Sequence, residues 1–186
     1  ILAITLAFPG GTAQDREGKE GETDLTAQVM TEGAGDLDAE AFRARLEDLA
    51  TNLSVSAGRD AMTVSFRTLT RYREEALGLL RLALVQPRFA PDALERAREG
   101  QLSTIARAAT SPGEIARDLW WRTAFAGHAY GHTGDGTPAS IAAIGPEDLR
   151  AVWRSQITRA GVKIGVVGDI AADQLAPLLD ALLGDL

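Results

Sequence analysis

Residues 18–33 have the sequence Gly18-Lys-Glu-Gly-Glu-Thr-Asp-Leu-Thr-Ala-Gln-Val-Met-Thr-Glu-Gly33, and this stretch is the most informative about the fold. Its apolar residues recur at helical spacing, which predicts a helix over residues 23–32 with one apolar face. Thr23 or Asp24 is expected to cap the start of this helix, and Gly33 to end it. The chain therefore passes from a glycine-rich loop into a short amphipathic helix.

The rest of the chain predicts elements in the order strand, helices, hairpin, helices, strand, helix. The expected strands cover residues 1–8, 53–57, 62–69 and 162–167. The expected helices cover residues 39–50, 71–85, 91–109, a segment from 112 onward, 138–141, 146–157 and 172–183. This order predicts an α+β fold, in which helices pack on a mainly antiparallel sheet, rather than regular βαβ alternation. The apolar start could also be the end of a signal peptide, but it lacks a basic region, so a strand is the preferred interpretation.

The composition fits one globular domain over residues 1–186, with 45% hydrophobic and 24% charged residues. A formal net charge of −7 argues against a nucleic-acid binder, because neutralising phosphates requires a basic face. The absence of cysteine excludes disulfides, thiolate nucleophiles and cysteine-based metal sites. No apolar stretch reaches the length needed to span a bilayer.

Three stretches together resemble the pitrilysin, or insulinase, family of inverzincin metallopeptidases, which includes insulin-degrading enzyme and mitochondrial processing peptidase. They are residues 18–33, then Gly127-His-Ala-Tyr-Gly131 continuing to Gly136-Thr-Pro-Ala-Ser-Ile141, and finally Val166-Val-Gly-Asp169. The resemblance implies a metalloprotease half-domain of the LuxS and processing-peptidase type. It further implies that this chain corresponds to the first half of a longer protein, in which two similar halves enclose a chamber.

The resemblance also implies a lost metal site. Active relatives carry the zinc motif H-x-x-E-H, in which two histidines bind the metal and the glutamate acts as general base. The matching positions here are Asp24, Ala27 and Gln28, and the third family ligand, a glutamate, falls near Thr104. The nearest acid, Glu99, is more than a helical turn away. We therefore expect no zinc and no catalytic residue in this half.

Three other groups of residues have simpler interpretations. His128 and His132 lie among glycines, so a structural turn is expected rather than a metal site. Trp120 and Trp121 are expected to pack in the core or an interface rather than to form a ligand platform. An acidic cluster near the first helix is expected to be solvated and to complement the helix dipole. Its members are Glu17, Glu20, Glu22 and Asp24.

By resemblance, the expected role is that of a non-catalytic partner that docks on a zinc-bearing half or subunit and helps to bind peptides. The expected peptide-contacting strand consists of Leu53, Ser54, Val55, Ser56 and Ala57, which could pair with an extended substrate at a sheet edge. One alternative is a peptidase that works through Asp24 with nearby acids, or through another half of the chain. Another is a purely structural assembly subunit. Because two-subunit bacterial relatives are often exported, a periplasmic location is expected, with the cytoplasm as the alternative.

Overall fold

The computed structural model describes residues 1–186 as four strands, eight α-helices and three short 3-10 helices. The strands are β1 (Leu2–Pro9), β2 (Asn52–Ala57), β3 (Ala61–Thr68) and β4 (Lys163–Gly168). The α-helices are α1 (Glu22–Val29), α2 (Ala39–Asp48), α3 (Arg73–Val85), α4 (Pro91–Ala108), α5 (Pro112–Ala124), α6 (Pro138–Ala143), α7 (Pro146–Gln156) and α8 (Ala172–Leu183). The 3-10 helices are η1 (Thr12–Gln14), η2 (Thr70–Tyr72) and η3 (Ala129–Gly131). The predicted order of elements is confirmed. None of the helices is both long and apolar enough to cross a lipid bilayer.

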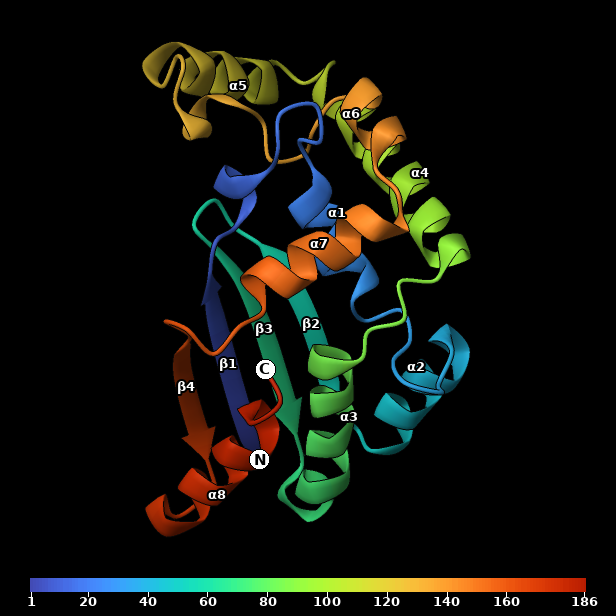
Figure 1. The fold of residues 1–186 in the computed structure, drawn as a ribbon, viewed down its shortest axis with the longest axis vertical. Coiled ribbons are helices and arrows are strands. Elements are labelled where there is room, and N and C mark those ends of the chain that lie inside the picture. The colour runs from blue at the N-terminus through green and yellow to red at the C-terminus, as the bar shows by residue number, and fades with distance from the viewer.

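The four strands form one sheet in the order β2-β3-β1-β4, and every neighbouring pair is antiparallel (Figure 1). The predicted α+β fold with a mainly antiparallel sheet is therefore confirmed. β1 lies in the interior of the sheet, where it pairs with β3 on one side and β4 on the other. The strand predicted over residues 53–57 is β2, and it lies at one edge of the sheet.

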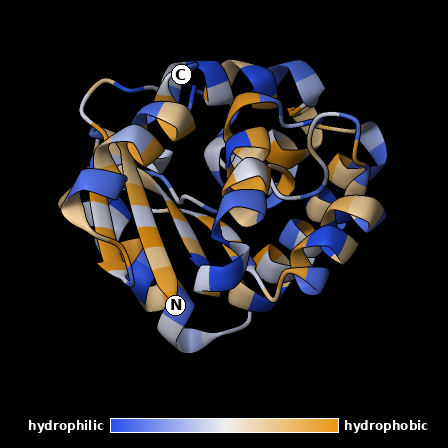
Figure 2. Cartoon of the chain, turned by 90° about the horizontal axis from the view of Figure 1, so that it is seen from below, coloured by the Kyte–Doolittle hydropathy of each residue, from blue (hydrophilic) through white to orange (hydrophobic).

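The core lies on one face of the sheet. Leu2, Ile4, Leu6 and Phe8 alternate with more exposed neighbours along β1 and are each at most 1% exposed. Successive side chains of a strand point to opposite faces, so this alternation places all four against the helices α1, α3 and α7 (Figure 1). Figure 2 shows the same alternation as hydrophobic and hydrophilic bands along the strands. The opposite face of the sheet is open and carries small polar residues such as Thr5.

Helix α5 departs from the expected packing. It lies at one end of the molecule, beyond the tip of the β2–β3 hairpin (Figure 1), and none of its residues is buried. Trp120 is 57% exposed, so it does not pack in the core, and its packing in an interface stays a prediction. Trp121 is half-buried and instead lies against Arg59 of the hairpin. The reason is positional: α5 does not cover the sheet, so its apolar residues have no core to enter.

The tip of the β2–β3 hairpin is fixed by the chain that leaves β1. The backbone N–H groups of Thr12 and Ala13 donate to the carbonyls of Gly58 and Arg59, each at 2.9 Å. This close approach requires glycine at position 11, where φ is +75° and an added Cβ would lie 2.3 Å from the Gly58 carbonyl oxygen. The tip is therefore a rigid anchor beside the cavity described below.

Candidate functional site

Gly21 is the N-cap residue of helix α1, and no side chain at this position caps the helix. Instead, the carboxylate of Asp15 in the preceding loop accepts hydrogen bonds from the backbone N–H groups of Gly21 (2.8 Å) and Thr23 (3.1 Å). The prediction that Thr23 or Asp24 caps this helix is therefore wrong. Thr23 is buried, and its hydroxyl accepts from the side chain of Gln156 at 3.0 Å, so its position is set by tertiary contacts.

Burial raises the pKa of Asp15 to about 6, against the opposing effect of its hydrogen bonds from Thr23 and Gly21. Between its usual pKa of 3.8 and this value, the folded state keeps a proton that the unfolded state has lost, so stability falls as pH rises. We expect the free energy of unfolding from urea titrations to fall between pH 4.5 and 7.5. That fall should be smaller by about 2 kcal/mol in Asp15→Asn, which cannot titrate. An equal or larger fall in the variant would contradict this assignment.

The acidic cluster is not solvated throughout. Glu22 is only 1% exposed, and its carboxylate is paired with the guanidinium of Arg16. Arg16 also pairs with Asp148 at the start of α7, at 2.7 Å. The prediction of a solvated cluster is thus wrong for Glu22, because α7 packs beside α1 and covers the entry to this helix.

The three positions that match the family's zinc motif lie along α1. Ala27 is 1% exposed and belongs to the core cluster, so its methyl group leaves no polar atom where a general base would be needed. The side-chain nitrogen of Gln28 donates to Asp24 Oδ2 at 2.9 Å and to Gln101 Oε1 on α4 at 2.8 Å. Both hydrogens of the Gln28 amide are thereby used. Gln101 in turn donates to the carbonyl of Asp135 at 3.0 Å.

Gln101 is the residue of this site that the sequence analysis missed. It lies on the same helix as Thr104, one turn earlier, and is 4% exposed. The hydroxyl oxygen of Thr104 accepts from Arg107 at 3.1 Å. Residues three apart share a helical face, so counting back one turn from Thr104 would have indicated Gln101 as a neighbour of α1. Glu99 is exposed.

This set of side chains does not fit zinc. Zinc in proteins prefers imidazole, thiolate and carboxylate ligands, and here only Asp24 is one of these. Gln28 could offer only its neutral carbonyl oxygen, a weak ligand, because its nitrogen has no lone pair to give and donates to Asp24 and Gln101. Burial raises the pKa of Asp24, and the nearby carboxylate of Asp135 raises it further, while the hydrogen bond from Gln28 acts in the opposite direction. The site is therefore organised by amide hydrogen bonds.

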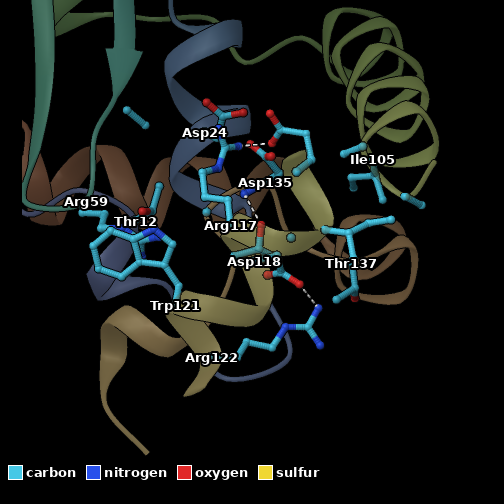
Figure 3. A pocket seen from close by; sticks show the side chains of 18 of the residues that line it. Thr12, Asp24, Arg59, Ile105, Arg117, Asp118, Trp121, Arg122, Asp135 and Thr137 are labelled. Atoms are coloured by element: carbon cyan, nitrogen blue, oxygen red, sulfur yellow. Dashed lines mark hydrogen bonds and ion pairs between the residues drawn. The ribbon is translucent and has the colours of Figure 1, made fainter. Parts of the chain in front are cut away.

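A cavity of about 710 Å³ connects this site to the sheet edge (Figure 3). Asp24 lies on its wall, and so do Ala57 and Gly58 at the end of β2. Helices α4 and α5 contribute apolar side chains, including Ile105, Ile115 and Trp121. The cavity thus joins Asp24, the end of the edge strand and helix α5 in one concave surface, which is the usual shape of a ligand site.

The residues of β2 divide between two faces. Leu53, Val55 and Ala57 are half-buried on the helix-covered face, whereas Ser54 and Ser56 are exposed on the open face. β2 is hydrogen-bonded only to β3, so its other edge carries unpaired main-chain groups. The predicted position of this strand at the sheet edge is confirmed.

The two histidines lie at a turn, as predicted. His128 Nδ1 accepts from the backbone N–H of Tyr130 at 3.1 Å and caps the short helix η3. His132 follows η3, and its Nδ1 lies 3.4 Å from the carbonyl oxygen of Thr133. The rings therefore make local contacts within this turn.

Three known proteins are similar to this chain over nearly its whole length. A relative in Helicobacter pylori (strain ATCC 700392 / 26695), called non-peptidase homolog YmxG, is 27% identical over 180 residues, which cover 97% of this chain and 42% of the relative. The crystal structure of a peptidase M16 inactive domain from Pseudomonas fluorescens is 26% identical, with a TM-score of 0.94, and the match covers all of this chain and 45% of that one. Pitrilysin, at 15% identity, shares the fold with a TM-score of 0.84 over 99% of this chain and 20% of its own.

This chain thus spans less than half the length of these relatives. Residues 2–136 match the sequence profile of the insulinase family, peptidase family M16. The matched residues include β1, α1 and β2. They end in the loop at residues 133–136, which lines the cavity. The chain therefore belongs to the insulinase family, peptidase family M16.

Proposed function

We propose that this chain is a non-catalytic, zinc-free half-domain that pairs with a zinc-bearing half or subunit of the same family and completes a closed peptide-degrading chamber. The observation that carries the proposal is the hydrogen-bond network at the motif positions. Gln28 is held by Asp24 and Gln101, and Ala27 provides no base. Hydrolysis by the family's mechanism requires both a metal-bound water and a base, and neither has the residues it needs here.

The relatives support the same conclusion. One is named a non-peptidase homolog and another an inactive domain of this family. A match to less than half of each relative leaves room for a second half, which supports pairing. The periplasm is our proposed location, by analogy with exported two-subunit relatives.

We assign peptide binding to strand β2, which consists here of Leu53, Ser54, Val55, Ser56 and Ala57. An exposed sheet edge binds an extended peptide through main-chain hydrogen bonds, and the cavity at the end of β2 offers space for its side chains. This role needs no metal, so it is compatible with the lost motif.

Peptides methylated at backbone nitrogens test strand addition directly. The probe is a fluorescein-labelled, proline-free twelve-residue peptide selected from an immobilised peptide scan, with binding followed by fluorescence anisotropy. Only every second N–H of an added strand faces its neighbour. Methylating one alternate set should therefore weaken binding at least about tenfold, since several hydrogen bonds of roughly 1 kcal/mol each are lost. Methylating the other set should leave binding unchanged. Equal effects of both sets would exclude strand addition.

Pairing is tested by co-expression with zinc-bearing members of the family from the same genome. We expect a stable complex, peptide cleavage by the complex and none by this chain alone. Cleavage by the partner alone at the same rate would reject the chamber role and favour a purely structural subunit. Cleavage by the isolated chain that is lost in Asp24→Ala would instead support a peptidase built on Asp24 and its neighbouring acids.

A further inference from the structure

Helix α5 contacts the rest of the molecule through few side chains, and Trp121 packs edge-on against Tyr130 of η3, with ring centroids 6.2 Å apart. No residue of this helix is buried. The side-chain hydrogen bonds and ion pairs that its residues make stay within the helix: Arg117 pairs with Glu114, Arg122 with Asp118, and the Thr123 hydroxyl donates to the Leu119 carbonyl. A helix of 13 residues is marginal when isolated, so its position depends on the contacts it makes with neighbouring elements.

The main contact of α5 with the sheet is made through Arg59 at the hairpin tip. Its guanidinium carbon lies 3.8 Å from the centroid of the Trp121 ring, within the range of a cation–π interaction. The same guanidinium donates to the carbonyl of Tyr130 at 3.0 Å, and the Tyr130 hydroxyl donates to Asp60. We call Arg59, Trp121 and Tyr130 the latch.

The two sides of the latch differ in rigidity. The hairpin tip is fixed by the hydrogen bonds from Thr12 and Ala13 described above. Helix α5, in contrast, has Gly113 in its first turn and Gly127 just beyond its end, and a side chain added at either glycine would have no atom within 4 Å. Opening the latch would therefore move α5 and leave the tip in place.

Helix α5 also forms one wall of the cavity. Ile115, Asp118 and Trp121 line the cavity, and Figure 3 shows Asp118 and Trp121 on its wall, with Trp121 beside Arg59. Ala57 and Gly58 at the end of β2 line the same cavity, so a peptide that runs along β2 into the cavity would meet α5 there. Displacing α5 would open the part of the cavity next to the end of β2.

We propose that α5 is a lid on the cavity, that the Arg59–Trp121 contact holds it closed, and that a peptide enters when this contact opens. The peptide part of this inference rests on the proposed function, whereas the movement of the lid does not. Cation–π contacts at partly exposed sites favour the bound arrangement by roughly 2- to 30-fold. Removing this contact should raise the ratio of open to closed molecules by that factor.

The absence of cysteine allows this to be measured without background labelling. Spin labels on Ala116→Cys in α5 and Ser65→Cys in β3, both exposed positions, report the distance between the lid and the sheet by double electron–electron resonance. The parent should give one dominant distance. Arg59→Ala and Trp121→Leu should each add a second, longer population, and combining them should add little more because they break the same contact.

Arg71→Ala is the matched control, because Arg71 makes a comparable contact with Tyr72, 4.7 Å from the ring centroid, at a site that does not involve α5. This variant should keep the parent distance. Unchanged distances in both Arg59→Ala and Trp121→Leu, with normal thermal unfolding, would overturn the lid.

The labelled peptide then tests the link to binding. Its association rate should rise in Arg59→Ala by the same factor as the open population. A moved lid with an unchanged association rate would reject gating by α5 while leaving strand addition at β2 intact. If the two methylated peptides bound equally well, the result would argue against strand addition at β2. It would not argue against the lid.

Discussion

A variant that carries Asp24→His, Gln28→His and Thr104→Glu is expected to retain about one zinc ion per chain after dialysis, whereas the natural chain retains none. Positions 24 and 28 are one turn apart on α1 and share a helical face. Helix α4 approaches this face closely enough for Gln28 to bond with Gln101 at 2.8 Å, and position 104 lies one turn further along α4. Two imidazoles and a carboxylate would supply three zinc ligands. Zinc content measured by mass spectrometry checks this.

The matched control replaces Thr104→Glu by Ser103→Glu, because Ser103 is exposed on another face of α4. This control should hold zinc at least about tenfold more weakly, since it lacks the third ligand. Equal zinc retention by both variants would mean that position 104 does not face α1. The zinc-binding variant should still not cleave peptides, because position 27 remains alanine and supplies no base.

Secondary structure was largely predictable from the sequence because its cause is local. Apolar periodicity placed every strand and α-helix, and proline at the first turn marked the starts of α4 and α5. The edge position of β2 came from the family resemblance and is confirmed. The errors lie where distant residues decide the outcome. Asp15 takes the capping role expected of Thr23, and α7 buries Glu22.

The candidate site was predictable only in part, for the same reason. The residues that the resemblance pairs with the zinc motif, Asp24, Ala27 and Gln28, can be found in the sequence, because they lie on one helix. The partner Gln101 comes from a helix 73 residues away, and nothing near Gln28 indicates it. The contact between Arg59 and Trp121 joins a hairpin tip to a helix with no buried residue. Hydrophobic periodicity carries no information about such a contact, since both residues lie outside the core.

A buried side chain of α7 fixes the entry to α1. Gln156, at the end of α7, is 2% exposed. Its Oε1 accepts from the Gly11 N–H at 2.9 Å, and its Nε2 donates to the Thr23 hydroxyl at 3.0 Å and to the Gly11 carbonyl at 3.3 Å. The Gln156 amide therefore connects the segment after β1 and the start of α1 to the end of α7 by direct hydrogen bonds.

Gln156→Leu keeps a similar size but leaves the buried N–H of Gly11 without a partner and removes the hydrogen bond to the Thr23 hydroxyl, while the Gly11 carbonyl still accepts from the backbone N–H of Gln14 at 3.1 Å. An unsatisfied buried polar group costs about 1–3 kcal/mol, so the loss of stability should be about 2 kcal/mol. For a chain of this size, that corresponds to a melting temperature lower by about 4–8 °C, measured by calorimetry. Gln14→Leu, at an exposed position, should change stability by less than about 0.5 kcal/mol. Equal melting temperatures for the two variants would show that Gly11 and Thr23 find other partners. The expected difference follows because Gln156 is the only side chain that bonds to both polar groups of the Gly11 backbone.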